Sequence, residues 1–201
     1  MRIVNSQAML VWATPEPAKV IERIARVCYK SEEKITDSSA GSLIRMLIER
    51  GHLAMIEHAS ASLHFICDRG VSHEIVRHRL ASFAQESTRY CNYGKDKFGC
   101  EITVIKPPDI DNDVFEAMAS SAESDYMFLL KGGHAPQTAR AVLPNCLKTE
   151  IVMTANFREW LHFLELRCSK AAHPQMREVA FMARDILRGV CPEVFSIEKE
   201  N

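Results

Sequence analysis

Apolar residues follow two different spacings along this chain, and each spacing predicts a different kind of element. Stretches in which apolar and polar residues alternate, or in which branched residues dominate, are predicted as strands: about 2–12, 60–67, 101–105 and 147–155. Stretches with apolar residues three and four positions apart are predicted as helices: about 17–29, 39–50, 71–78, 112–131, 136–143, 156–167 and 174–189. This mixture predicts the α+β class.

Short polar stretches mark where these elements begin and end. Asp37–Ser39 supplies helix N-caps, and Asn156 with Glu159 has the spacing of a capping box. Gly132-Gly133 ends the long helix. No repeat, low-complexity segment or linker interrupts residues 1–201. We therefore expect a single domain, with helices flanking a mostly antiparallel twisted sheet.

Charge and cysteine content narrow the class of protein. The chain has 25 Lys and Arg against 26 Asp and Glu, a formal net charge of −1, which argues against a protein that coats nucleic acid or an anionic membrane. No apolar run approaches the ~18 residues of a membrane span, and residues 1–17 are too polar for a secretory signal. The seven cysteines are odd in number and form no CxxC, which favours a reducing cytoplasm over a disulfide framework or zinc clip.

Positive charge is nevertheless concentrated in RHRLASFAQESTRY, residues 77–90. Three arginines and a histidine lie there beside several hydroxyl and amide side chains, without a helical apolar stripe. We expect a long loop after a helix ending near His78, on which Glu74 would share a face with Arg77 and His78. The segment is either a solvated surface with an ion pair or an anion site, because guanidinium groups and hydroxyls bind phosphate oxygens directly.

Other chemistry-bearing residues give weaker signals. His52, Glu57 and His58 resemble a set of metal ligands, but neighbours on a helix diverge by about 100°, so core or capping histidines are favoured and no metal site is predicted. GxGxxG, GxxxxGK[ST] and GxSxG do not occur in the sequence, so it offers no Rossmann, P-loop or nucleophile-elbow signature. Cys91 has no evident base at a useful spacing and is interpreted as a bystander thiol.

The predicted helix 156–167 carries basic residues on two faces. Arg158 and His162 share one face, whereas Arg167 prolongs an apolar stripe. A partly buried guanidinium needs a carboxylate or an anionic ligand, because burying an unpaired charge is costly. A structural ion pair and a ligand site both meet that need, and Arg140 in its short helix poses the same choice.

Taken in order, these segments closely resemble the flavin-dependent thymidylate synthases. The signature of that family is Arg-His-Arg, seven residues, then Ser, with Arg-Tyr just beyond, and it is complete here as RHR at 77–79, Ser87 and Arg89-Tyr90. Further motifs of the family are matched in the same order by ARVCY, GHLAMIEH, ARAVLP and TANFREWLHFLELR, at 25–29, 51–58, 139–144 and 154–167.

The resemblance implies a fold similar to thymidylate synthase complementing protein, a homotetramer, and the conversion of dUMP to dTMP. FAD would be the cofactor, with 5,10-methylenetetrahydrofolate as carbon donor and NADPH as reductant. FAD contacts are implied for Arg77, His78, Arg79, Gln85, Asn156, Arg158, His162 and the position of Ala54. Contacts with dUMP are implied for Glu74, Arg77, Gln85, Glu86, Ser87, Thr88, Arg89, Arg140 and Arg167. Arg167 would lie against the uracil and favour its N3-deprotonated form.

Three positions depart from the usual family pattern. Ala54 stands where many members have Thr, Gln85-Glu86 where members often place Glu first, and His162 where some have Asn. Two other functions remain as alternatives: a nucleic-acid-binding domain that uses the same basic segment, and a flavoprotein with different substrates. The net charge of −1 disfavours the first, because nucleic-acid binders usually spread basic charge along one face.

Overall fold

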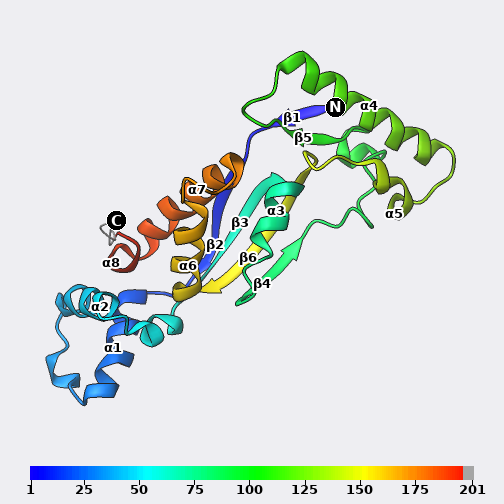
Figure 1. Ribbon diagram of the computed structural model, residues 1–201. Coiled ribbons are helices and arrows are strands. Elements are labelled where there is room, and N and C mark those ends of the chain that lie inside the picture. The colour runs from blue at the N-terminus through cyan, green and yellow to red at the C-terminus, as the bar shows by residue number, and fades with distance from the viewer. Residues whose placement is uncertain (197–201) are drawn as a thin grey trace. The chain divides into compact units, whose positions relative to one another are not determined.

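The structure, a computed structural model, describes residues 1–196 and has the expected α+β composition (Figure 1). Its strands are β1 Arg2–Val4, β2 Gln7–Ala13, β3 Ser60–Asp68, β4 Ala81–Gln85, β5 Thr103–Ile105 and β6 Lys148–Asn156. Its α-helices are α1 Pro17–Tyr29, α2 Ser39–Glu49, α3 Arg69–Ile75, α4 Asn112–Lys131, α5 Pro136–Ala139, α6 Phe157–Arg167, α7 Pro174–Val190 and α8 Pro192–Phe195. Short 3₁₀ helices span Glu32–Lys34, Leu53–His58, Asp96–Phe98 and Arg140–Val142.

The strands form a four-stranded sheet in the order β2-β3-β6-β4 and a two-stranded sheet of β1 and β5. Strands β3 and β6 are antiparallel, because Phe157 N–H donates to the carbonyl of Ala59 at one end and Arg69 N–H donates to that of Leu147 at the other. By contrast, β1 pairs in parallel with β5. The mostly antiparallel sheet predicted from the sequence is confirmed.

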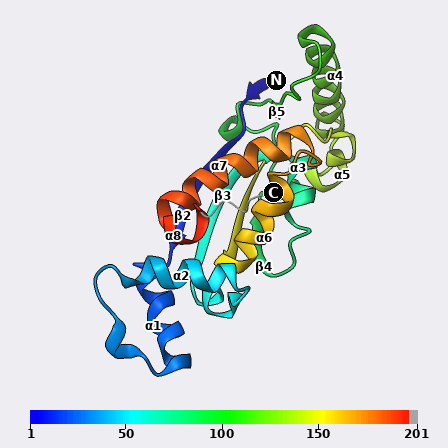
Figure 2. The ribbon, with the colours of Figure 1, turned by 60° about the vertical axis from the view of Figure 1, so that its left-hand side comes forward.

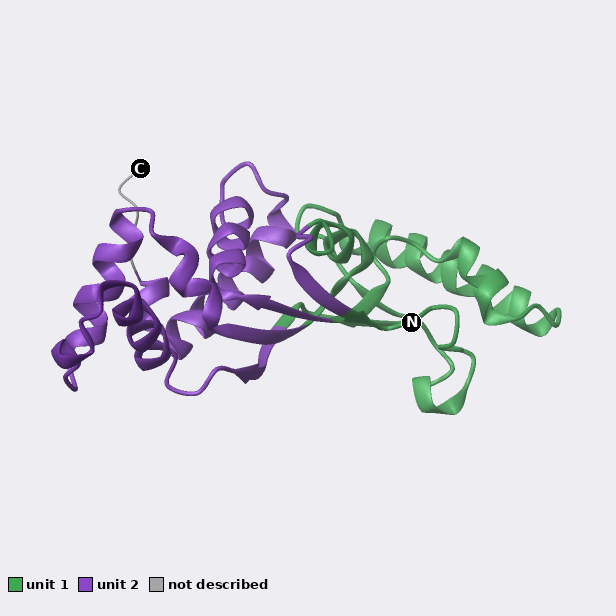
Figure 3. Ribbon diagram, turned by 90° about the horizontal axis from the view of Figure 1, so that it is seen from below, with its two compact units in different colours: residues 1–7, 65–77, 84–151 green, residues 8–64, 78–83, 152–201 purple. Residues whose placement is uncertain are grey.

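The chain divides into two compact units, coloured separately in Figure 3. Unit 1 comprises residues 1–7, 65–77 and 84–151, and unit 2 comprises 8–64, 78–83 and 152–201. In unit 1, α4 buries Phe115 and Tyr126 against a core that includes Val104 and Leu147. The single domain predicted from the sequence stays a prediction.

Unit 2 holds α6 and α7 side by side, as Figures 1 and 2 both show. Helix α6 is anchored on β3, because the indole N–H of buried Trp160 donates to the carbonyl of Ala61 at 3.0 Å. Residues 149–155 of β6 alternate buried and half-buried, which is the pattern of a strand with one covered face. A separate small core forms where Ala25 of α1 meets Leu43 and Leu47 of α2.

Two predicted elements are wrong in detail. The strand expected over 2–12 is interrupted after Val4, because its first part pairs with β5 and its second part pairs with β3. The helix expected to reach His78 ends at Ile75, so Arg77 and His78 lie beyond it and do not share a helical face with Glu74.

The segment expected as a loop after that helix contains strand β4. Its residues alternate between half-buried and exposed, but its small Ser82 and Ala84 gave no apolar alternation to recognise in the sequence. No helix among residues 1–196 is long and apolar enough to cross a membrane.

Candidate functional site

In unit 1, the amide of Gln85 is fixed at the end of β4. Its Nε2 donates to Ser72 Oγ of α3 at 2.8 Å and to Thr149 Oγ1 of β6 at 3.2 Å. Helix α3 is placed by its N-cap Asp68, whose carboxylate accepts from Val71 N–H at 2.7 Å. Because Nε2 makes both bonds, the carbonyl Oε1 of Gln85 is the group that can accept from a ligand.

Two arginines lie at the loop that follows Gln85: Arg89 is part of the loop, and Arg140 contacts it. Arg140 Nη1 donates to Oγ1 of buried Thr88 at 3.4 Å, and Arg89 Nε donates to Gln137 Oε1 at 3.2 Å. Ser87 Oγ accepts from the backbone N–H of Arg89 at 3.3 Å. A loop of hydroxyl side chains therefore carries one arginine of its own and accepts a hydrogen bond from a second, 52 positions away, which is an arrangement suited to a phosphate.

Glu86, the neighbour of these residues, has protein partners. Its carboxylate accepts from Tyr93 Oη and from Lys148 Nζ, both at 2.9 Å. Lys148 also contacts Glu150 at 2.6 Å, and its pKa is raised because the bonds to the two carboxylates outweigh its desolvation. Glu86 is thus engaged in a charged network that lines a cavity of about 330 Å³ within unit 1.

In unit 2, the buried side chain of His78 packs against one side of helix α6. Its Nδ1 lies 3.0 Å from Oε1 of buried Glu159, and its Nε2 accepts from Arg167 Nε at 3.1 Å. The ring of Phe163 packs on the imidazole with centroids 4.9 Å apart, and the ring of His162 lies at 5.7 Å. The four contacts come from Glu159 and from the residues three, four and eight positions after it, of which Glu159, Phe163 and Arg167 lie along one stripe of α6.

The two neighbours fix the protonation of this imidazole. A carboxylate only accepts and a guanidinium only donates, so His78 carries its proton on Nδ1 and presents a bare Nε2 to Arg167. Burial lowers the pKa of His78 and Arg167 lowers it further, against the opposing effect of Glu159. His78 is therefore neutral at physiological pH.

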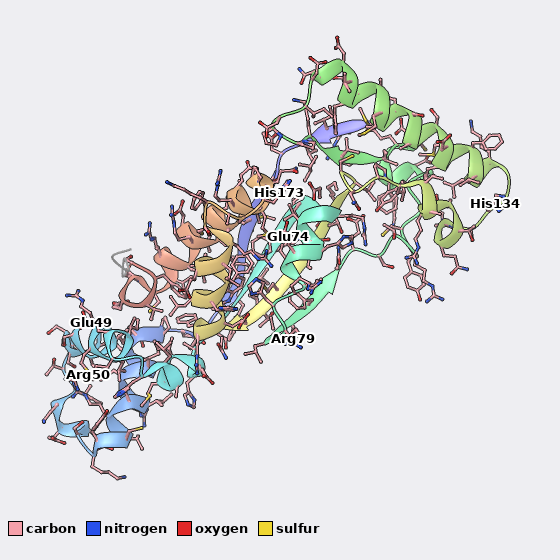
Figure 4. The ribbon with its side chains drawn as sticks, in the orientation of Figure 1. Glu49, Arg50, Glu74, Arg79, His134 and His173 are labelled. Carbon is pink, nitrogen blue, oxygen red and sulfur yellow. The ribbon has the colours of Figure 1, made fainter. Side chains whose placement is uncertain are left out.

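Of the other residues implied for FAD, Arg77 and Gln85 belong to unit 1, and the rest lie on the surface of unit 2 or at the start of α6. Asn156 is the N-cap, and its Oδ1 accepts from Glu159 N–H at 2.9 Å, so its amide nitrogen carries the donors that can reach a ligand. Arg158 pairs with Glu57 at 2.6 Å, and both side chains are largely exposed. Ala54, Arg79 and His162 are also exposed, and Figure 4 labels Arg79 just before β4.

Within residues 1–196, one group has the spacing of metal ligands: His78, Glu159 and His162 offer atoms within 4.8 Å of one another. The Arg167 guanidinium at 3.1 Å from His78 opposes a second cation there. Of the residues first considered as ligands, Glu57 is paired with Arg158. The group is better explained as a hydrogen-bonded network.

The side chain of Glu159, which contacts His78, was not singled out from the sequence. Glu159 was interpreted only as part of a capping box, whereas its side chain turns to His78, a residue 81 positions away in sequence. The signal available was its spacing from Phe163 and Arg167 on the same stripe of the helix.

Cys91 is half-buried, and the pKa of its thiol is raised first by burial and second by Glu86, so it is a poor nucleophile.

Known proteins resemble the chain along nearly its whole length. The sequence profile of the family described as thymidylate synthase complementing protein matches residues 9–193. A flavin-dependent thymidylate synthase from Geobacter sulfurreducens is 32% identical over 194 residues, covering 92% of this chain and 84% of that protein. Another from Mycobacterium sp. strain JLS is 34% identical and covers 89% of this chain and 79% of its own.

Solved structures show the same fold. A UMP/dUMP methylase from Streptomyces cacaoi, bound with 5-Br dUMP, has a TM-score of 0.80 at 24% identity and covers 98% of this chain and 96% of its own. A flavin-dependent thymidylate synthase from Helicobacter pylori, complexed with FAD and dUMP, has a TM-score of 0.78 at 24% identity, covering 94% and 97%. With the profile and the curated relatives, the conclusion is that this chain belongs to the thymidylate synthase complementing protein family of flavin-dependent thymidylate synthases.

Proposed function

We propose that this chain is a flavin-dependent thymidylate synthase, which converts dUMP to dTMP with FAD as its cofactor. The observation that carries this function is the hydrogen bond from Arg140 to Thr88, in the hydroxyl-rich loop that also contains Ser87 and Arg89, in a chain of this family. A nucleotide phosphate needs such charged donors and hydroxyls at one place.

The residues of unit 1 divide between the phosphate and the remainder of dUMP. Ser87, Thr88, Arg89 and Arg140 are the donors proposed for the phosphate. Gln85 uses its amide nitrogen on Ser72 and Thr149, so we assign its Oε1 to a donor of the nucleotide, such as a sugar hydroxyl. Glu74, Arg77 and Glu86 are proposed as further dUMP contacts.

The donor set of unit 2 fits FAD. The exposed guanidinium groups of Arg79 and Arg158 suit a pyrophosphate, and the amide nitrogen of Asn156 and the ring of His162 add further donors. Arg77, His78, Gln85 and the position of Ala54 complete the proposed contacts. FAD supplies hydride transfer when bound, and the protein supplies orientation and electrostatics. No protein nucleophile is required.

Arg167 is proposed to contact the uracil and to favour its N3-deprotonated form. A guanidinium keeps its proton at every working pH, so Arg167 acts by stabilising negative charge and not as a base. It is half-buried, where a charge–charge interaction is stronger than in bulk water. Its hydrogen bond to His78 holds the guanidinium plane in place.

The co-substrates and the assembly are also part of the proposal. We infer that 5,10-methylenetetrahydrofolate supplies the carbon unit and NADPH the electrons. We further infer a cytoplasmic homotetramer. Family membership supports each of these inferences.

Purified protein is expected to be yellow, to release FAD on denaturation, and to form dTMP only when dUMP, methylenetetrahydrofolate and NADPH are all present. UMP replaces dUMP as the matched substrate control, and comparable turnover of UMP would broaden the substrate class. Arg140→Ala should weaken dUMP binding about 10- to 100-fold, the effect of losing a charge-assisted hydrogen bond. An FAD-loaded, folded protein that forms no dTMP would overturn the proposed function.

A further inference from the structure

Helix α6 contains a buried carboxylate that the proposed reaction does not use directly. Glu159 is 6% exposed and sits in the first turn, where a glutamate of a capping box normally bonds back to the N-cap backbone. Here the first bond of the capping box is present, because Asn156 Oδ1 accepts from Glu159 N–H. The second bond is replaced, because Glu159 Oε1 lies 3.0 Å from His78 Nδ1. Burying a carboxylate is costly without a donor, so the contact with His78 Nδ1 stabilises Glu159 in this position.

The contact continues to Arg167 through the imidazole. With Nδ1–H donated to Glu159, the lone pair of Nε2 is left to accept from Arg167 Nε at 3.1 Å. The opposite tautomer would set an N–H of His78 against an N–H of Arg167 and leave Glu159 without this donor. Carboxylates that orient an imidazole in this way are known to fix both its tautomer and its ring angle.

Packing makes the arrangement rigid. The imidazole contacts the ring of Phe163, whose centroid is 4.9 Å away, and Phe163 in turn packs on buried Trp160 at 5.3 Å. Glu159, Phe163 and Arg167 follow one another at intervals of four residues on α6. One helical stripe thus holds both ends of the hydrogen-bonded chain.

We propose that Glu159 is a positioning residue, which acts through the Nδ1–H tautomer of His78 to orient the Arg167 guanidinium toward the uracil of dUMP. This role rests on the proposed function, in which Arg167 stabilises charge on the substrate. Glu159 itself contacts neither substrate nor cofactor in this proposal.

The first test is independent of catalysis. Nitrogen-15 NMR of the imidazole groups, with the His78 signals identified by their loss in His78→Gln, should show a neutral ring protonated on Nδ1 at about pH 7.5. Glu159→Ala should change the nitrogen shifts of His78, while Glu22→Ala should not, because Glu22 is a buried carboxylate of unit 2 that bonds Arg26 instead. A His78 ring protonated on Nε2 in the wild type overturns the proposal.

The second test separates positioning from folding. In single-turnover oxidation of reduced flavin at saturating dUMP and methylenetetrahydrofolate, Glu159→Ala should be about 10- to 100-fold slower, the usual cost of losing an orienting partner. Its Kd for dUMP should change less than about threefold, because the loss falls on charge stabilised in the transition state. Glu159→Gln keeps an oxygen that accepts from Nδ1–H and should recover most of the rate.

Several outcomes contradict this role: a wild-type rate in Glu159→Ala, a Glu159→Gln as slow as Glu159→Ala, or an equal loss in Glu22→Ala. If the wild type forms no dTMP, the proposed function fails. The NMR result then still decides whether Glu159 sets the tautomer of His78.

Discussion

At the scale of single residues, the network proposed to orient Arg167 is built around one buried imidazole. His78 lies between an acceptor, Glu159, and a donor, Arg167, and these two neighbours dictate where its proton resides. Because the ring is neutral, Arg167 is the charged member of the pair. The positive charge that would stabilise a developing uracil anion is therefore the charge of the Arg167 guanidinium.

The lowered pKa of His78 predicts how stability responds to acid. Its folded-state pKa lies below the ordinary value of 6.5, so in mild acid the unfolded chain binds a proton that the folded chain does not. The free energy of unfolding should therefore fall as pH drops from 6.5 toward the folded-state pKa, and this contribution is fully present above 6.5. Thermal unfolding between about pH 7.5 and 5.5 measures the slope. His78→Gln should flatten it and exposed His134→Gln should not; equal slopes in all three proteins would disprove the assignment.

Arg167 is expected to contribute more to rate than to binding. Arg167→Ala should lower the saturated rate of flavin oxidation by about 10²–10³, the cost of one preorganised donor in other enzymes. Arg167→Lys keeps the charge but loses the planar fork, so it should recover only part of the rate. Single-turnover kinetics with dUMP and methylenetetrahydrofolate measures both variants. A weaker Kd for dUMP with an unchanged saturated rate would make Arg167 a binding residue only.

At the scale of elements, the sequence predicted those with strong periodicity and missed those formed by pairing. Helices α4, α6 and α7 follow their apolar spacing and caps closely. Strand β4 was missed because its sequence, ASFAQ, shows no clear alternation of apolar and polar residues. Strands β1 and β2 were predicted as one strand because the local sequence pattern does not show which strand each part pairs with. The contact between Glu159 and His78 was missed for the same reason, since it joins residues 81 positions apart.

The N-cap of α4 offers a test of the helix assignment that leaves the site untouched. Asp111 accepts from the backbone N–H groups of Asp113 and Val114 at 2.9 and 3.3 Å. Asp111→Ala should lower the free energy of unfolding by about 0.5–2 kcal/mol, because these donors lose their acceptor. Exposed Asp109→Ala removes the same charge two residues earlier and should have little effect in urea unfolding. An equal loss in both variants would argue against capping.

At the scale of the whole molecule, the residues proposed for the two ligands fall into two compact units. Unit 1 contains Arg140 and the loop proposed for the phosphate of dUMP, and unit 2 contains α6 and His78. The sequence supplied the identity of these residues through its family motifs. The sequence did not show the hydrogen bonds within the protein, and these bonds determine which donor and acceptor atoms of each side chain remain available to a ligand.

The proposed homotetramer predicts that two variants with little activity regain activity when their chains are mixed in one tetramer. Arg77→Ala and Arg140→Ala each remove a proposed dUMP contact, so each alone should form little dTMP when dUMP is held well below the Kd of the variant. Mixed tetramers formed by unfolding and refolding the two together should regain some dTMP formation if the residues reach one site from different subunits. Refolding either variant alone is the control. A monomer by light scattering would contradict the assembly.

The most direct test of the central claim measures the amount of dTMP formed relative to the amount of reduced FAD that is oxidised. Protein with reduced FAD is mixed without oxygen with excess dUMP and methylenetetrahydrofolate, and flavin oxidation and dTMP are both quantified. A flavin-dependent thymidylate synthase should form about one dTMP for each FAD oxidised, because the hydride that completes the methyl group comes from the reduced flavin and not from the folate. Flavin that stays reduced, or is oxidised without formation of dTMP, would contradict the account.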